Sequence, residues 1–166
     1  EEQIERYSRQ IILPNIGGKG QKKLLASRVL IVGAGGLGSP AAFYLAAAGI
    51  GTLGLADSDV VDPSNLQRQI LHATPDIGIS KAASAARKLT ALNPDCHIVE
   101  HILRVDCTNI LGLIESYDLV IDGTDNFPTR FLINDACVMA GKPLIHAGVF
   151  RHEGQAMTIV PGRGPC

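Results

Sequence analysis

The chain has 166 residues, with 15 Lys and Arg against 16 Asp and Glu and a formal net charge of −1. A length near 150 residues predicts one domain, and the balanced charge argues against a binder of duplex nucleic acid, which carries a basic excess. Hydrophobic residues make up 46% of the chain, which excludes wholesale disorder. No apolar stretch approaches the ~20 residues of a membrane span. Four widely spaced cysteines, without a Cys-x-x-Cys pair, predict a reduced, cytoplasmic protein.

Strand-like apolar runs alternate with helix-like stretches along the chain. The predicted strands are residues 28–32, 52–56, 97–102, 118–121, 143–146 and 156–160, and the predicted helices are 39–48, 80–92, 108–115 and 127–140. This alternation predicts an α/β fold, with a Rossmann-like, mostly parallel sheet and helices on both faces. The last run follows the fifth through a glycine-containing turn, GVFRHEGQ, without a crossover helix. We therefore expect an antiparallel strand near the C-terminus.

The two ends of the chain differ from this alternating pattern. Residues 1–27 are expected to form a helical segment and a glycine-rich loop, NIGGKG, outside the sheet, and residues 28–166 to form the sheet domain. The final residues, PGRGPC, are expected to be the edge of a longer chain, so that this domain is truncated at its C-terminus. Cys96 and Cys107 lie in or beside apolar runs, and we expect both to be buried.

A glycine loop, GAGGLG, follows the first predicted strand and leads directly into a helix. In Gly-x-Gly-x-x-Gly at such a position, Gly33 allows the tight turn, Gly35 lets phosphate oxygens approach the backbone, and Gly38 lets the helix pack closely on the strand. The helix N-terminus then favours an anion. The loop predicts nucleotide binding, and the alternative is a glycine-rich structural turn. Asp57 ends the second strand. An acidic residue at this position accepts hydrogen bonds from ribose hydroxyls, and the alternative is that it merely caps the turn.

Cationic and acidic residues follow at the ends of later elements. The segment SNLQRQ, residues 64–69, is interpreted either as phosphate-binding or as a solvated, capped helix. Ser80 is predicted to cap the next helix, which places Lys81 at its first position. A positive charge at that position interacts unfavourably with the helix dipole, at a cost of ~0.3–1 kcal/mol. A bound anion would explain why a lysine stands there. The alternative is that Lys81 simply points into water. Asp125 is a candidate Mg²⁺ ligand or the cap of the following helix, and Asp122 is expected to be structural.

These features together suit Mg-ATP better than a dinucleotide. An NAD-binding oxidoreductase module explains the glycine loop and Asp57, but it gives no role to Lys81, Arg68 or Asp125. A hydride-transfer enzyme also needs a substrate domain, for which the chain has no further residues.

Six segments occur in an order that identifies a family resemblance: RYSRQI, VGAGGLGSP, SNLQRQ, GISKA, DGTDN and EGQ. They cover essentially the whole chain, which resembles the ThiF/MoeB/HesA family, similar to the adenylating domain of ubiquitin-activating enzymes. The resemblance implies ATP-dependent adenylation of the C-terminal Gly-Gly carboxylate of a small ubiquitin-like sulfur carrier of the ThiS or MoaD type. It also implies a homodimer, and it leaves the thiamine and molybdenum-cofactor pathways undecided.

The resemblance assigns catalytic roles to four residues. Arg68 and Lys81 match positions that hold phosphates, Asp125 matches the Mg²⁺-linked aspartate, and Arg9 matches an arginine that reaches the ATP of the neighbouring subunit. The implied nucleotide-binding set is Gly33, Gly35, Gly36, Gly38, Asp57, Ser64, Asn65, Leu66, Gln67, Arg68, Lys81, Asp125 and Asn126.

One feature of the family is incomplete in this sequence, namely its structural Zn²⁺ site. Cys166 matches the start of the first of two Cys-x-x-Cys pairs, and one cysteine cannot make a four-ligand site. We therefore expect zinc only in a longer form of the chain, and we assign no sulfur-transfer role to the other cysteines. A non-catalytic scaffold half, like the inactive partner of heterodimeric activating enzymes, is a further alternative. Because such halves tend to lose the catalytic cations, the presence of Arg9, Arg68 and Lys81 counts against it.

Overall fold

A computed structural model describes residues 2–164 of the chain. Its centre is a six-stranded sheet in the order β3-β2-β1-β4-β5-β6. The first five strands in the chain pair in parallel, and β6 pairs antiparallel with β5. This confirms the predicted fold class, including the antiparallel strand. The strands are β1 (Arg28–Val32), β2 (Thr52–Ala56), β3 (His97–His101), β4 (Leu119–Asp122), β5 (Leu144–Phe150) and β6 (Glu153–Ile159).

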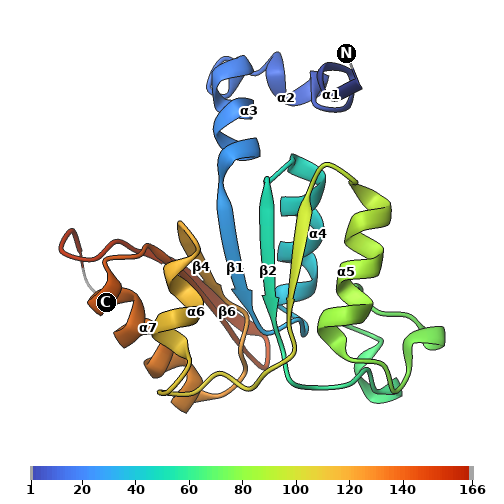
Figure 1. The fold of residues 1–166 in the computed structure, drawn as a ribbon. Coiled ribbons are helices and arrows are strands. Elements are labelled where there is room, and N and C mark those ends of the chain that lie inside the picture. Colours follow the sequence, from blue (N-terminus) through green and yellow to red (C-terminus); the bar gives the residue numbers. More distant parts are fainter. Residues whose placement is uncertain (1, 165–166) are drawn as a thin grey trace.

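Both faces of the sheet are covered by helices, because the central strands are apolar on both sides. Val29 and Ile31 of β1 pack with the cluster that contains α4 and α5, whereas Leu30 and Val32 pack with the cluster that contains α6 and α7. Figure 1 shows these two pairs of helices on opposite sides of β1. The covering helices are α4 (Gly38–Ala48), α5 (Lys81–Leu92), α6 (Ile110–Glu115) and α7 (Phe127–Ala140), with two short 3₁₀ helices at Pro63–Asn65 and Thr74–Asp76 between β2 and α5.

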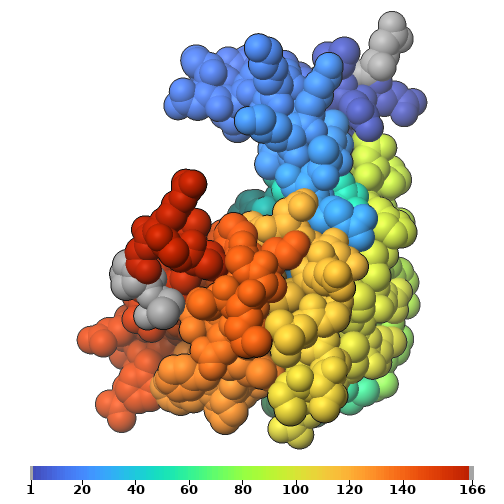
Figure 2. Space-filling model, turned by 60° about the vertical axis from the view of Figure 1, so that its left-hand side comes forward, coloured from blue at the N-terminus to red at the C-terminus, as the bar shows by residue number. Residues whose placement is uncertain are grey.

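Three short helices precede the sheet: α1 (Glu2–Arg6), α2 (Ser8–Ile11) and α3 (Gly17–Ala26). They lie at the amino ends of the strands and project from the rest of the molecule in Figure 2. Side-chain amides fasten them to the end of α4, since Gln10 and Gln21 both donate to the Ala48 carbonyl, at 3.0 and 2.9 Å. The buried Tyr7 receives a further bond from Asn93. The segment is therefore held by satisfied polar contacts at the carboxyl end of α4.

Three local predictions differ from the structure. Most of the expected glycine-rich loop NIGGKG lies inside α3, whose first turn is closed by the bond from Gly20 N to Ile16 O. The expected turn GVFRHEGQ is mostly strand, because β5 and β6 remain paired as far as Phe150 and Glu153. Cys107, expected to be buried, is exposed in the connection between β3 and α6, whereas Cys96 is buried as predicted.

A helix that crosses a lipid bilayer needs about 20 predominantly apolar residues. Within residues 2–164, no helix combines the length and the apolar character that such a crossing requires.

Candidate nucleotide-binding site

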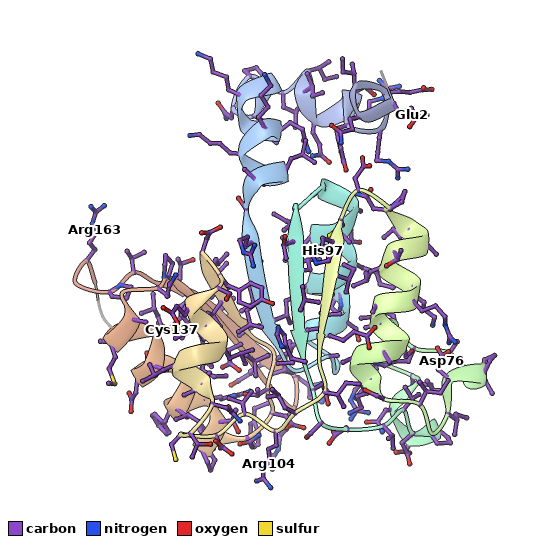
Figure 3. All side chains as sticks on the ribbon, viewed as in Figure 1. Glu2, Asp76, His97, Arg104, Cys137 and Arg163 are labelled. Carbon is purple, nitrogen blue, oxygen red and sulfur yellow. The ribbon has the colours of Figure 1, made fainter. Side chains whose placement is uncertain are left out.

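A cleft of about 750 Å³ lies at the carboxyl ends of the parallel strands. Its walls come from the loops after β1, β2, β3 and β4, the start of α5 and the first turn of α7. The labelled Arg104 marks this end of the molecule in Figure 3, opposite the helices that contain Glu2. The sheet reverses its strand order between β1 and β4, and ligands of open α/β sheets bind at such a point. The predicted site residues that line the cleft are Gly33, Gly35, Gly36, Asp57, Asn65, Arg68, Lys81, Asp125 and Asn126.

The glycine loop divides into packing glycines and glycines that face the cleft. Gly33 has a φ of 93°, and a methyl group on it would lie 2.9 Å from the Gly123 carbonyl oxygen. A methyl group on Gly38 would lie 1.8 Å from the carbonyl oxygen of Gly33. Gly38 therefore allows the close approach of helix and strand and does not line the cleft. At Gly35 and Gly36 the nearest side-chain atoms leave ordinary van der Waals room, so their backbone is open to a ligand.

Asp57 holds the glycine loop as well as lining the cleft. Its Oδ2 accepts a hydrogen bond from the Ala34 amide at 2.8 Å, and its Oδ1 accepts one from the Asp59 amide at 2.8 Å. The second bond is the turn cap that was the alternative to ribose binding. Carboxylate oxygens have about four acceptor sites in all, so these two bonds leave capacity for ribose hydroxyls.

The two predicted cations reach the cleft from different elements. Arg68 donates to the Ser64 carbonyl and the Asn65 side chain, both at 3.3 Å, and its stem lies beside Gly36. Lys81 is buried at the first position of α5, with its Nζ 2.9 Å from the Asp59 carboxylate. This pairing contradicts the alternative that Lys81 points into water.

The predicted cap of α5 is only half right. Ser80 occupies the N-cap position, but its hydroxyl makes no cap hydrogen bond and is buried without a partner among residues 2–164. The backbone at this point instead forms an antiparallel bridge between Ser80 and Val60, and the Lys81 amide donates to the Asp59 carbonyl. The loop after β2 therefore satisfies the first backbone amide of α5.

The loop after β4 adds one acidic side chain, Asp125, to the lining of the cleft. Asp122 is buried, accepts two bonds from Thr124 and pairs with His146 at 2.8 Å, which agrees with its expected structural role. Asn126 caps α7 by accepting from the Thr129 amide, so the cap is Asn126 and the alternative role of Asp125 is wrong. Asp125 lines the cleft. Within residues 2–164 no group of three or more His, Cys, Asp or Glu side chains is placed to hold a metal ion.

Several predicted residues lie away from the cleft. Ser64 pairs with Asp62, and Leu66 and Gln67 belong to the same turn without lining the cleft. Arg9 is exposed on α2, beside the amino ends of the strands and at the opposite end of the molecule. Cys166 lies outside the described residues.

Two arginines that the sequence interpretation missed complete the lining. Arg104 follows the end of β3, and Arg130 lies in the first turn of α7, where it donates to the Thr124 carbonyl at 3.2 and 2.8 Å. Both positions follow the carboxyl end of a parallel strand, the same rule that selected Asp57 and Asp125. Applying that rule to every predicted strand would have found Arg104, whereas Arg130 reaches the cleft from inside α7.

The chemistry of the cleft suits a phosphorylated ligand. Four cations, Arg68, Lys81, Arg104 and Arg130, line the same cleft as the glycine loop. Arginine and lysine side chains together with such a loop bind phosphate oxygens. Asp57, Asp59 and Asp125 add acceptors for hydroxyl groups or a hard cation.

The fold and this cleft define a doubly wound α/β domain of the nucleotide-binding type. The chain belongs to the ThiF family, whose family model matches residues 7–166. The family resemblance seen in the sequence is thereby confirmed.

Named relatives agree with the family assignment. The chain is 54% identical over 155 residues to the probable adenylyltransferase/sulfurtransferase MoeZ of Mycobacterium tuberculosis, covering 93% of this chain and 40% of the relative. It is 51% identical over 164 residues to the SAMP-activating enzyme E1 of Haloferax volcanii, covering 99% of this chain and 60% of the relative. A crystal structure of E. coli MccB with ATP superposes with a TM-score of 0.87 at 30% identity, over 95% of this chain and 48% of that one. The chain thus spans about half the length of such relatives.

Proposed function

We propose that the protein adenylates the C-terminal glycine carboxylate of a small ubiquitin-like sulfur-carrier protein, with Mg-ATP as co-substrate and pyrophosphate as product. The observation that carries the proposal is the arrangement of Arg68 and Lys81 beside the open glycine loop, with Asp57 and Asp125 on the same cleft. Relatives named as adenylyltransferases and as an E1 for SAMP, together with a similar fold that holds ATP, support it.

In this reaction a carboxylate oxygen of the carrier attacks the α-phosphorus of ATP. The new bond is an acyl phosphate, the bond between the α- and β-phosphates breaks, and its electron pair leaves with pyrophosphate. Because charge spreads over phosphate oxygens, the protein contributes mainly positioning and charge stabilisation. Arg68 and Lys81 would supply positive charge at the phosphates, and Asp57 would orient the ribose.

A magnesium ion fits this cleft through Asp125. Mg²⁺ in nucleotide sites takes one or two carboxylates along with substrate phosphates, so it needs no dense ligand cluster. The carboxylate of Asp125 lines the cleft and is not used to cap α7. The ion would neutralise part of the phosphate charge.

Zinc, by contrast, is expected only with the ligands of a longer chain. The cytoplasm remains the expected compartment because the widely spaced cysteines are typical of reduced proteins.

We further propose that the active unit is a homodimer in which Arg9 serves the ATP of the partner subunit. Arg9 is exposed on α2, and the cleft of its own subunit lies at the other end of the sheet. The positive charge of Arg9 would therefore act at the cleft of a second copy of the chain, as an arginine finger supplied in trans does.

The proposed function is tested by ATP–pyrophosphate exchange with candidate carrier proteins, using the longest natural form of the chain. Arg68→Ala and Lys81→Met should each lower exchange by about 100-fold or more, since charge stabilisation in a dry site is worth ~3–4 kcal/mol. Methionine is chosen at Lys81 because that side chain is buried and an alanine would leave a void. Lys22→Ala on the exposed surface of α3 is the charge-matched control and should leave exchange unchanged.

Calorimetry separates this proposal from the NAD-binding alternative. We expect ATP to bind and its affinity to fall when Mg²⁺ is removed, with NAD binding much more weakly. NAD binding as tight as ATP binding would contradict the proposal. Near-normal exchange in both cation variants would mean that Arg68 and Lys81 take no part in the reaction, whereas absence of exchange in the wild type would favour the scaffold alternative.

A further inference from the structure

A buried imidazole, outside the cleft lining, lies where three elements of the proposed site meet. His72 is 5% exposed and lies at the end of the turn that begins with the Arg68 segment. Its Nε2 is 3.0 Å from the carbonyl oxygen of Ala34 in the glycine loop, and its Nδ1 is 3.0 Å from Oγ of Ser84 in α5. In Figure 1 the segment between β2 and α5 runs beneath the carboxyl ends of the strands, which brings these elements together.

The partners determine which ring nitrogen carries the proton. A carbonyl oxygen only accepts, so Nε2 of His72 donates to Ala34, and in the neutral ring Nδ1 accepts from the Ser84 hydroxyl. Each nitrogen of the ring has one partner, and each partner belongs to a different element. The orientation of the ring is thereby set from both sides.

Both partners of His72 lie next to proposed nucleotide contacts. Ala34 sits between Gly33 and Gly35, and its amide is already held by Asp57. Ser84 lies three residues after Lys81, one turn along α5. The imidazole therefore connects the glycine loop to the helix that begins with the buried lysine.

We propose that His72 is a positioning residue, which holds the glycine loop in register with α5 so that loop amides and the Lys81 ammonium meet the same phosphates. This inference rests on the proposed function. The physical reason is that preorganised donors cost no rearrangement when the ligand binds. His72 is not alone in binding the Ala34 carbonyl, because the Ser39 hydroxyl also donates to it at 3.2 Å. We therefore expect loss of His72 to weaken ATP binding without abolishing it.

Two substitutions separate the contacts of the ring. The amide nitrogen of glutamine corresponds to Nε2 and can keep the bond to Ala34, whereas that of asparagine corresponds to Nδ1 and can reach only Ser84. His72→Gln keeps the bond to Ala34 but loses the contact with Ser84, so it should raise the KM for ATP by only about threefold. His72→Asn should raise it by about tenfold, the effect of one lost hydrogen bond. Because bound ATP restores the loop, kcat at saturating ATP should fall less than KM rises.

The measurements are ATP–pyrophosphate exchange and calorimetry with Mg-ATP on the longest natural form of the chain, alongside thermal denaturation. A purely structural role predicts that both variants lose stability and kcat alike with an unchanged KM, and that result overturns the proposal. Ser84→Ala gives a second route if His72→Asn fails to fold. This variant frees the ring from α5, which is the contact that His72→Gln also loses, and it should likewise raise the KM for ATP by about threefold. An unchanged KM in Ser84→Ala also overturns the proposal. Absence of ATP binding by the wild type would instead reject the proposed function itself.

Discussion

At the scale of single residues, the three described cysteines differ in their environments. Burial raises the pKa of the Cys96 thiol to about 11, and burial together with the nearby Asp122 raises the pKa of Cys137 to about 11. Both thiols are therefore protonated at neutral pH and poor nucleophiles. Cys137 lies inside α7 in Figure 3, whereas Cys107 is exposed beside the cleft.

These differences predict selective alkylation of the folded protein. At pH 8, iodoacetamide should modify Cys107 and leave Cys96 and Cys137 unmodified until denaturant is added. Peptide mapping by mass spectrometry identifies the modified sites, and Cys107→Ser provides the control for background labelling. Modification of either buried thiol at the rate of Cys107 would show that its part of the core opens readily.

Two histidines, the buried His72 and the half-buried His101, link stability to pH. Burial lowers the pKa of His72, and the charges of Lys88 and Lys81 act in the same direction, while the Ala34 bond and Asp57 oppose them. Burial also lowers the pKa of His101, whose ring bonds to the Tyr117 hydroxyl. In the unfolded chain these histidines are protonated with a pKa near 6.5. Between that pH and their lower pKa values in the folded protein, the unfolded chain therefore binds more protons than the folded protein does.

The free energy of unfolding should therefore be highest above about pH 6.5 and should fall as the pH drops through this window. Urea titrations at pH 7.5, 6.5 and 5.5 measure it. His72→Gln removes one of the two titrating groups, so its loss of stability over the same range should be smaller than that of wild type. An identical pH dependence in the variant would mean that His72 does not contribute.

At the scale of an element, the glycine loop combines two requirements in six residues. Gly38 is needed for packing, because any side chain there would collide with the backbone of Gly33. Gly36 is free of such a collision, and its exposed backbone faces the cleft. Folding and ligand binding should thus respond to different glycines of the same loop.

Alanine substitutions test this division. Gly38→Ala should lower the free energy of unfolding by about 3 kcal/mol, the cost of strong overpacking. Gly36→Ala should change it by less than about 1 kcal/mol but should weaken Mg-ATP binding at least tenfold, since the methyl group would stand where phosphate oxygens approach the backbone. Denaturant titrations measure the change in stability, and calorimetry on the same preparations measures the change in Mg-ATP affinity. Equal destabilisation by the two substitutions would contradict the assignment of packing to Gly38 and ligand binding to Gly36.

At the scale of the whole molecule, the N-terminal helices lie at the amino ends of the strands in Figure 1, whereas the residues that line the cleft follow their carboxyl ends. Satisfied side-chain bonds fasten these helices to the end of α4, so Arg9 is held away from the cleft of its own subunit. A role for Arg9 in catalysis therefore requires a second copy of the chain.

Mixing of inactive subunits tests this requirement. Arg9→Ala and Asp125→Ala should each abolish most exchange activity alone. In a mixed dimer one site carries both lesions, whereas the other combines an intact Asp125 with an intact Arg9 from its partner. Activity should return at that one site, measured by pyrophosphate exchange after subunit mixing. If native mass spectrometry proves that mixed dimers form and no activity returns, Arg9 does not act in trans.

The sequence by itself was sufficient for the elements and for most of the cleft. Periodic apolar runs and flanking glycines are local properties, so the strands and covering helices were predicted to within a few residues, except around β5 and β6. The glycine loop, Asp57, Lys81 and Asp125 were found because each stands in a motif beside the end of its own element. Local propensity failed in α3, where three glycines are helical because the turn is closed against Ile16 and the helix is fastened to α4.

Only the tertiary structure decided which distant residues meet. Arg130 lines the cleft because its side chain reaches back from the first turn of α7 to the Thr124 carbonyl in the loop after β4, and nothing in the sequence around Arg130 indicates that contact. The same holds for His72, whose two partners lie 38 and 12 residues away in the chain. The distance of Arg9 from its own cleft likewise follows from the direction of β1, which puts everything before it at the amino ends of the strands and the ligand-binding loops at the other.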